Sequence, residues 1–416
     1  FLNLQMSPAA LDVNVHPAKL EVKFAREREV FSAVYHSVCT ALDALQELEA
    51  MRRAARPQED NVTAQQQRLE VQAEEKQESR PVLTTRAYTP AIVDENGKVV
   101  DGSIAELRAI DVNGKSEWIT IRGYDQTKPV ILFLAGGPGG TQLAATRIEL
   151  AELEKYFVVV NWDQPGSGKS FHAMNYKDIT VDTYIEDGIA VTEYLRGRFG
   201  QDKIYLIGES WGSALAIMLA KEKPEYYGGV IGTGQTVAFR EMEEMDYNKA
   251  IEILESKGDT DKLEKLREQG APWYYEGNIA MKSNAYLGVL SDEMATNPNI
   301  SNAGYNTFEE MFGSEYGIRD SFDYLLALLK TFNVVYPQLE EIDLRETHNQ
   351  LEVPVYFFEG AYDINAPLYI AEDYYEMLEC PKKEWVLFEH SGHSPWKNEK
   401  SKFVEETIRV FSDGCE

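Results

Sequence analysis

The chain has 416 residues, which is enough for two domains or for one large domain with an insertion and a tail. Its 41 lysines and arginines stand against 69 aspartates and glutamates, and the resulting formal net charge of -28 disfavours binding to nucleic acid or anionic membranes. The sequence contains no apolar run near the roughly 20 residues that a membrane-spanning helix needs. We therefore expect no nucleic-acid partner and no membrane span in this chain.

The cysteines indicate neither a disulfide framework nor a metal centre. Cys39, Cys380 and Cys415 are far apart and form no C-x-x-C or Cys/His spacing, so we expect no metal site. This usage favours a reducing compartment, and we predict a cytoplasmic location. The start at Phe1, without a methionine, is compatible with a fragment of a longer product.

Two segments of different composition come first in the chain. Residues 1–45 hold short strand-like stretches followed by a helical pattern over 26–45, which predicts a small α+β fragment. Residues 46–80 are rich in Gln, Glu and Arg and have almost no large apolar side chains. Such a segment buries too little surface to offset its ordering entropy, so we predict a flexible linker.

From residue 81 onward, apolar runs alternate with amphipathic helical stretches, which is typical of an α/β domain. The predicted strands cover 117–123, 130–134, 157–162, 204–208, 228–234, 353–360 and 384–389, and helical patterns follow at 181–199, 213–223 and 398–411. Several of the strands are apolar almost throughout, as expected for a mostly parallel sheet with helices on both faces.

A long helical insertion interrupts this alternation. Residues 238–350 contain helical, acidic and aromatic segments and no convincing strand pattern. We predict that this insertion forms a cap over the carboxyl edge of the sheet. The α/β core would then consist of residues 81–237 and 351–416.

Residues Gly208-Glu209-Ser210-Trp211-Gly212 form a G-x-S-x-G pattern between an apolar strand and an amphipathic helix. This context is typical of a nucleophile elbow, in which two glycines let strand and helix approach and a strained turn exposes the serine hydroxyl. We predict that Ser210 is a nucleophile. The alternative is an ordinary glycine-containing turn between a strand and a helix.

A second glycine cluster, from Gly136 through Pro138 to Gly139, directly follows the strand at 130–134. Glycines leave backbone N–H groups uncovered, so such a loop can stabilise an oxyanion. We predict that the N–H groups of Gly137 and Trp211 form an oxyanion hole, with Gly136 and Pro138 contacting the substrate. The alternative is a tight turn without a ligand.

A serine nucleophile needs an acid and a base, and in this type of fold they follow it in that order along the chain. Asp363 lies just past the strand at 353–360, and His390 and His393 follow the strand at 384–389. His393 follows Ser391-Gly392 on a flexible loop that can reach the serine, so we choose it as the base and keep His390 as the alternative.

Five motifs in order, "AGGPGG", "NWDQPGSGKS", "GESWGS", "GAYDINAP" and "SGHS", resemble those of the proline iminopeptidase-like serine hydrolases of the α/β-hydrolase superfamily. The resemblance covers residues 91–416 and implies the α/β-hydrolase fold with a helical cap and no cofactor. It also maps the same elbow, oxyanion loop, acid and base onto Ser210, Trp211, Gly137, Asp363 and His393.

The sequence departs from this family at three positions. Ala135 replaces the usual histidine before the glycines, Pro165 replaces the arginine of the D-Q-R-G loop, and Ile364 replaces a carboxylate that often binds the substrate amine. Acidic cap residues such as Glu241 and Glu244, or their neighbour Glu243, could substitute for it. The alternative is a solvated acidic helix face.

We therefore predict a serine hydrolase that works through an acyl-enzyme, most simply an aminopeptidase that releases an N-terminal residue from short peptides. An esterase or small-amide hydrolase with the same triad is the alternative. The substrate would be a small peptide or a small acyl compound.

The Gly-Lys-Ser at 168–170 could suggest a phosphate-binding loop, but Asp163 stands where such a loop needs its first glycine. The resemblance instead implies that this stretch shapes the floor of the active-site entrance. We expect Lys169 to be solvated.

Residues 12–24, "DVNVHPAKLEVKF", resemble the end of the transducer region of MutL-type DNA mismatch-repair proteins. The resemblance covers residues 1–45 and implies that Lys19 would approach a nucleotide phosphate. Because the rest of such an ATPase is absent, we interpret the segment as a fused remnant or an artefact of gene assembly. A mismatch-repair-associated role through this segment is a third alternative.

Overall fold

The computed structural model describes residues 11–12, 23–24, 87–301 and 313–412. The chain forms two compact units, Phe1–Arg86 and Ala87–Glu416. In the first unit, strand β1 (Leu11–Asp12) pairs antiparallel with β2 (Lys23–Phe24). Lys19, the predicted helix at 26–45 and the predicted linker at 46–80 lie outside the described residues.

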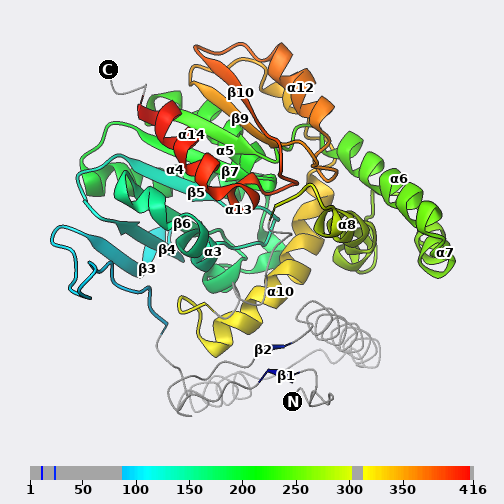
Figure 1. The fold of residues 1–416 in the computed structure, drawn as a ribbon, viewed down its shortest axis with the longest axis horizontal. Helices are drawn as coiled ribbons and strands as arrows, with labels where there is room; N and C mark the ends of the chain where they lie inside the picture. The colour runs from blue at the N-terminus through cyan, green and yellow to red at the C-terminus, as the bar shows by residue number, and fades with distance from the viewer. Residues whose placement is uncertain (1–10, 13–22, 25–86, 302–312, 413–416) are drawn as a thin grey trace, which may run out of the picture. The chain divides into compact units, whose positions relative to one another are not determined.

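The second unit is built on an eight-stranded sheet with the order β10-β9-β8-β7-β5-β6-β4-β3 (Figure 1). The strands are β3 (Ile104–Val112), β4 (Lys115–Gly123), β5 (Val130–Leu134), β6 (Val158–Asp163), β7 (Ile204–Glu209), β8 (Tyr227–Thr233), β9 (Val355–Gly360) and β10 (Lys383–Phe388). The strands from β5 to β10 pair in parallel, whereas β4 is antiparallel to both β6 and β3. This confirms the predicted mostly parallel sheet.

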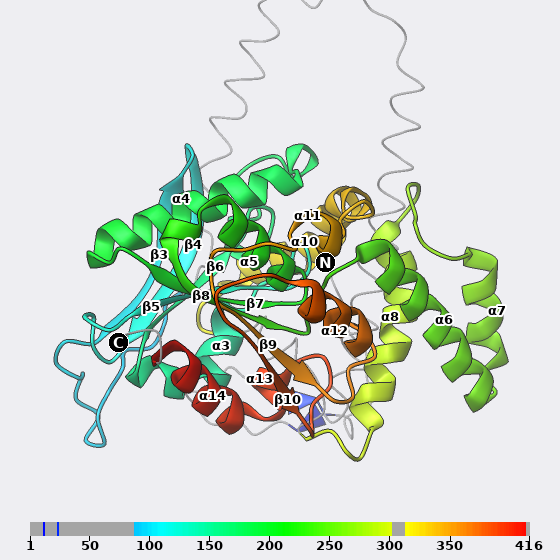
Figure 2. The same ribbon diagram turned by 90° about the horizontal axis from the view of Figure 1, so that it is seen from above.

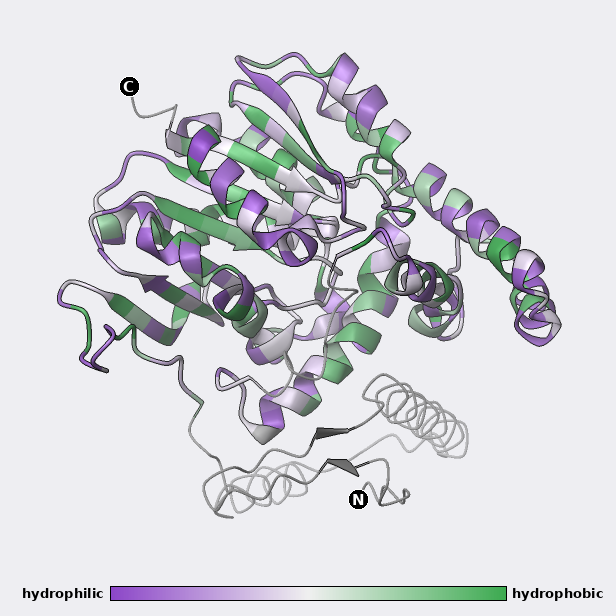
Figure 3. Cartoon of the chain, viewed as in Figure 1, coloured by the Kyte–Doolittle hydropathy of each residue, from purple (hydrophilic) through white to green (hydrophobic). Residues whose placement is uncertain are grey.

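Helices cover both faces of the sheet (Figures 2 and 3). They do so because the central strands carry apolar side chains on both faces. On β5, Leu132 and Leu134 belong to one core cluster, and Ile131 and Phe133 belong to another. The first cluster includes residues of α4 (Val181–Phe199), α5 (Trp211–Glu222) and α12 (Leu368–Met377), and the second those of α3 (Leu143–Glu149), α13 (Pro395–Asn398) and α14 (Lys400–Ser412). The sheet therefore lies between two apolar layers, which is the α/β-hydrolase arrangement.

Between β8 and β9 the chain forms the helices α6 (Phe239–Lys257), α7 (Thr260–Gln269), α8 (Ile279–Thr296), α10 (Ile318–Val335) and α11 (Leu344–Thr347). The first three helices lie together (Figure 2). They share an apolar cluster that includes Tyr247, Leu263 and Tyr286. Helix α10 returns to the core, where Thr331 Oγ1 donates a hydrogen bond of 2.6 Å to Gly166 O. This insertion leaves the sheet at the carboxyl end of β8, next to the predicted elbow.

Within the described residues, no helix is both long and apolar enough to cross a membrane.

Candidate active site

Ser210 lies on the turn between β7 and α5, with φ of 52° and ψ of -124°. Positive φ is uncommon for a residue with a side chain and stores strain of about 1–3 kcal/mol. The turn needs its glycines: a Cβ on Gly208 would lie 2.2 Å from Gly212 O, and one on Gly212 would lie 2.1 Å from Leu134 O. The strand and the helix therefore approach closely, as the G-x-S-x-G pattern predicted.

Asp363 and His393 meet at the carboxyl ends of β9 and β10. His393 Nδ1 lies 2.8 Å from Asp363 Oδ2. The other oxygen of Asp363 accepts hydrogen bonds from the N–H groups of Asn365 (2.8 Å) and Ala366 (3.0 Å), which fix the carboxylate. His390 instead lies with its Nδ1 3.3 Å from Asn299 O. The structure thus pairs His393, and not His390, with the predicted acid.

The charges around His393 favour its protonated form. Burial lowers the pKa of the imidazole, but Asp363, and beyond it Glu209 and Glu359, raise this pKa to about 9. A ring held against Asp363 through Nδ1 leaves Nε2 as its second site for a proton.

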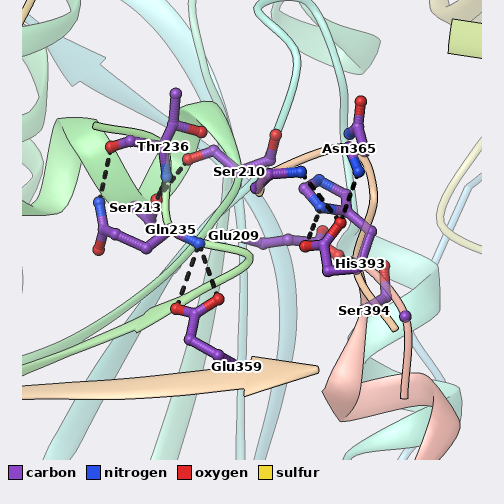
Figure 4. Close-up of polar contacts among 12 residues, drawn as sticks. Glu209, Ser210, Ser213, Gln235, Thr236, Glu359, Asn365, His393 and Ser394 are labelled. Atoms are coloured by element: carbon purple, nitrogen blue, oxygen red, sulfur yellow. Dashed lines mark hydrogen bonds and ion pairs between the residues drawn. The ribbon is translucent and has the colours of Figure 1, made fainter. Parts of the chain in front are cut away.

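Ser210 and His393 are neighbours through the turn that follows β8. The N–H of Ser210 donates a 3.0 Å hydrogen bond to Thr233 O, and a Cβ on the next residue, Gly234, would lie 2.9 Å from Nδ1 and Cε1 of His393. The imidazole therefore packs on the backbone that holds the elbow, and Figure 4 shows Ser210 beside the ring.

The glycine loop after β5 lies directly on the elbow. A Cβ on Gly136 would be 3.3 Å from both Ser210 Cβ and Glu209 O, and Gly137 has φ of 128°. Trp211 is the first residue of α5, where backbone N–H groups lack intrahelical acceptors. The predicted oxyanion donors, Gly137 and Trp211, are thus on segments that meet at Ser210, and Pro138 continues the same loop.

Two buried carboxylates beside these groups were missed by sequence reasoning. Glu209 accepts hydrogen bonds from Ser394 Oγ (2.6 Å) and Trp396 Nε1 (2.7 Å), and it also accepts one from Gln142 Nε2. Glu359 is at the end of β9, and burial raises its pKa to about 8. Both glutamates lie at the end of a buried strand and close in the chain to a predicted site residue. This position is the signal in the sequence that could have indicated these two residues.

The acidic residues of cap helix α6 differ in their surroundings. Glu241 forms an ion pair of 2.6 Å with Arg345, and Glu244 is exposed. Glu243 accepts hydrogen bonds from the hydroxyls of Tyr286 and Tyr336, and burial raises its pKa to about 7.

Asp246, one turn further along α6, was not predicted. It is 2% exposed, and its Oδ1 has no hydrogen-bond partner among the described residues. Burial, then the charges of Glu243 and Asp363, raise its pKa well above the usual range. The three-residue spacing from Glu243 is the signal in the sequence that could have indicated it.

The expectation that Lys169 is solvated was wrong. Its side chain is 5% exposed, its Nζ lies 2.5 Å from Asp320 Oδ2 of α10, and it lies 4.3 Å above the ring of Trp118. The cap brings the carboxylate to the lysine, which the local sequence does not reveal. The Asp163 carboxylate accepts a 2.7 Å hydrogen bond from Lys169 N and fills the inside of the turn, where a phosphate-binding loop would hold its anion.

No group of three or more His, Cys, Asp or Glu side chains suited to a metal ion occurs in the part of the chain that the structure describes.

A serine on a strained strand-to-helix turn, an Asp–His pair and a glycine loop, all at the carboxyl ends of parallel strands, define the class of α/β-hydrolase enzymes. The chain belongs to the alpha/beta hydrolase fold family, whose model matches residues 129–397. The model for the C-terminal domain of DNA mismatch repair proteins matches residues 1–43.

The relatives of the chain include peptidases. A probable aminopeptidase, YbaC of Bacillus subtilis (strain 168), is 32% identical over 74% of this chain and 96% of its own length. A proline iminopeptidase of Clostridium botulinum is 27% identical over 67% of this chain and 87% of its own length. A proline iminopeptidase-related protein of Thermus thermophilus has a similar fold, with a TM-score of 0.52 and 19% identity over 75% of this chain and 99% of its own. The chain is thus a hydrolase of this family.

Proposed function

We propose that the protein is a serine aminopeptidase that releases a small N-terminal residue, such as proline, from short peptides. The observation that carries this proposal is the His393–Asp363 pair, packed against the turn that holds Ser210. The names of the relatives, an aminopeptidase and a proline iminopeptidase, support the substrate class.

In the proposed mechanism, Ser210 Oγ attacks the carbonyl carbon of the scissile amide while the neutral form of His393 takes its proton at Nε2. The N–H groups of Gly137 and Trp211 stabilise the oxyanion. The imidazolium then gives the proton to the leaving amine, and an acyl-enzyme forms. Water hydrolyses this ester with His393 again as base, and Asp363 keeps the ring oriented throughout.

An aminopeptidase must also recognise the ammonium group of its substrate. Asp246 and Glu243 provide two buried carboxyl groups in the cap, and Asp246 is close enough to Asp363 for the two to interact. An ammonium group bound beside them would favour their ionised forms. Ile364, beside Asp363, packs against the cap cluster that contains Tyr286 and Tyr336. We therefore propose Asp246 and Glu243 as ammonium-binding groups, alongside Glu241 and Glu244, the two that the sequence suggested.

The nucleophile is tested with proline and alanine arylamides and with a fluorophosphonate. Ser210→Ala should lower kcat by at least about 10⁴-fold and abolish labelling, while the thermal unfolding temperature stays near that of the wild type. Full turnover or full labelling in this variant would exclude Ser210 as the nucleophile.

An esterase or small-amide hydrolase with the same groups is the second candidate, because Ile364 replaces a carboxylate common in the family. Free and N-acetylated substrates separate the two functions. A loss of kcat/KM of more than about tenfold on acetylation, or ~1.4 kcal/mol, supports ammonium recognition, and a smaller loss supports the esterase.

Substitutions then identify the groups that recognise the ammonium. Asp246→Asn should reduce the discrimination between free and acetylated substrates. Glu241→Gln and Glu244→Gln test the two residues that the sequence suggested. Unchanged discrimination in Asp246→Asn would assign ammonium recognition to other groups.

A further inference from the structure

The side chain of Glu209 contacts both of the loops that face Ser210. It is the last residue of β7, is 1% exposed, and directly precedes the serine. The donor Gln142 follows the glycine loop, whereas the donors Ser394 and Trp396 follow His393. The carboxylate thus connects three segments, each of which carries a different part of the site.

Two packing contacts accompany the hydrogen bonds of Glu209. Trp396 packs edge-on against Phe133 of β5, with ring centroids 5.6 Å apart. A Cβ on Gly136 would lie 4.0 Å from Glu209 Oε2, so the glycine loop packs against this carboxylate as well as against the elbow. Hydrogen bonds to a carboxylate are about twice as strong as those between neutral groups, and a buried site strengthens them further.

We propose that Glu209 is a positioning residue: its carboxylate holds the His393 loop and the glycine loop in register with Ser210, and its charge favours the imidazolium that forms during catalysis. This inference rests on the proposed serine hydrolase function and adds a role for the residue between Gly208 and Ser210.

Electrostatics support the second part of this role. Besides Glu209, the acidic groups near His393 are Asp363, which contacts it, and Glu359 at the end of β9; each raises the pKa of His393 when it is ionised. Removing the charge of Glu209 while keeping the shape of its side chain should therefore lower that pKa, whereas a purely structural defect would leave it unchanged.

The test compares Glu209→Gln with the wild type in the hydrolysis of an arylamide substrate across pH. We expect kcat to fall about 10- to 100-fold with little change in KM, because small displacements of catalytic groups have effects of this size. We also expect the midpoint of the acidic limb of kcat/KM to move to lower pH by about half a unit or more.

A compensating change tests the hydrogen bond to the glycine loop. When Gln142→Glu is added to Glu209→Gln, the amide is at position 209 and the carboxylate at position 142, so a hydrogen bond between the two side chains is restored. The double variant should therefore recover most of the lost kcat.

Glu117→Gln is the matched control. Glu117 is equally buried and also accepts a hydrogen bond from an indole, Trp162 Nε1 at 2.8 Å, but it lies on β4. It should leave both kcat and the pH midpoint unchanged.

If Glu209→Gln does not fold, Trp396→Phe removes one donor and keeps an aromatic, though smaller, side chain, and it should lower kcat several-fold. Wild-type kcat and an unmoved pH midpoint in the folded Glu209→Gln protein would overturn the proposal, as would wild-type kcat in Trp396→Phe. A wild-type protein that neither turns over substrates nor reacts with the fluorophosphonate would instead overturn the serine hydrolase function itself. The two failures are therefore distinct.

Discussion

Gly212 lies at the closest contact between the elbow and the sheet. Any side chain there would meet Leu134 O at 2.1 Å and Ala135 O at 2.8 Å, and backbone atoms cannot move aside as a flexible side chain can. The turn around Ser210 therefore depends on the absence of one methyl group.

Gly212→Ala should accordingly lower the free energy of unfolding by about 3 kcal/mol, the upper part of the usual range for overpacking. Gly197→Ala is the matched control, because this glycine lies within α4 and a Cβ there would have no atom within 4 Å. It should stabilise the protein by about 0.5–1 kcal/mol. Denaturant unfolding measures both, and equal stabilities of the two variants would contradict the close contact.

Residue types indicated the groups of the proposed site, but not the contacts among them. Ser210, Asp363 and His393 could be proposed because each follows a predicted strand, and parallel strands end at one edge of a sheet. The hydrogen-bond partners of Glu209 could not be predicted from the sequence, because Gln142 and Trp396 are 67 and 187 residues away from Glu209 in the chain. The burial of Asp246 likewise depends on how the cap packs.

Helix α10, which belongs to the insertion between β8 and β9, contacts loops of the core. Besides the bond from Thr331 to Gly166, Ala327 O would lie 2.7 Å from a Cβ on Gly139 of the glycine loop. Near the start of the same helix, Asp320 pairs with Lys169 and accepts a 2.8 Å hydrogen bond from Gly317 N. The helix thus contacts the glycine loop, through Gly139, and the loop that contains Gly166 and Lys169.

Lys169→Met should therefore destabilise the protein by about 1–3 kcal/mol, because Asp320 would lose a charged partner in a partly buried place. It should also raise KM, since α10 would be held less firmly over the glycine loop. The exposed pair Lys155–Glu152 provides the control: Lys155→Met should change stability by less than about 1 kcal/mol. Unchanged stability and KM in Lys169→Met would show that this pair does not anchor the cap.

Strand prediction succeeded where both faces of a strand are buried and failed at β3, one of the two edge strands of the sheet, whereas the other edge strand, β10, was predicted. All six residues of β6 and of β7 are buried, and both strands were predicted from their apolar runs. Strand β3 was missed because only Ile104, Ile110 and Val112 of its residues are buried, so no continuous apolar run marks it. An edge strand is set by its pairing with β4, which a local pattern does not contain.

At the scale of the whole molecule, the unit from Ala87 to Glu416 buries several acidic side chains whose pKa is raised to neutral pH or above it. Burial raises the pKa of Glu117 to about 9, of Glu359 to about 8, and of Asp163 and Glu243 to about 7. In the unfolded chain the same groups would release their protons near pH 4. The folded state therefore binds more protons than the unfolded state between these values.

The sign of the pH dependence follows from this difference. The stability that these groups contribute is fully present below their unfolded pKa and is lost as pH rises towards their folded pKa, so the free energy of unfolding should fall between about pH 5 and 9. His393, whose pKa is raised to about 9, acts in the same direction above about pH 6.5. The protein should thus be more stable in mildly acidic than in mildly alkaline solution.

Glu117→Gln tests the largest of these contributions without touching the proposed site. An amide cannot ionise, so the free energy of unfolding of the variant should fall less steeply with pH than that of the wild type. The difference is up to ~1.4 kcal/mol per pH unit, and it makes the variant relatively more stable towards pH 9. Asp187 would keep its 2.7 Å ion pair with Lys115 and its 2.8 Å bond from Asn113. Denaturant unfolding of both proteins at pH 5, 7 and 9 measures the slopes. Parallel curves for the two proteins would mean that Glu117 is already ionised at neutral pH, and the buried acids would then not explain the loss of stability in alkali.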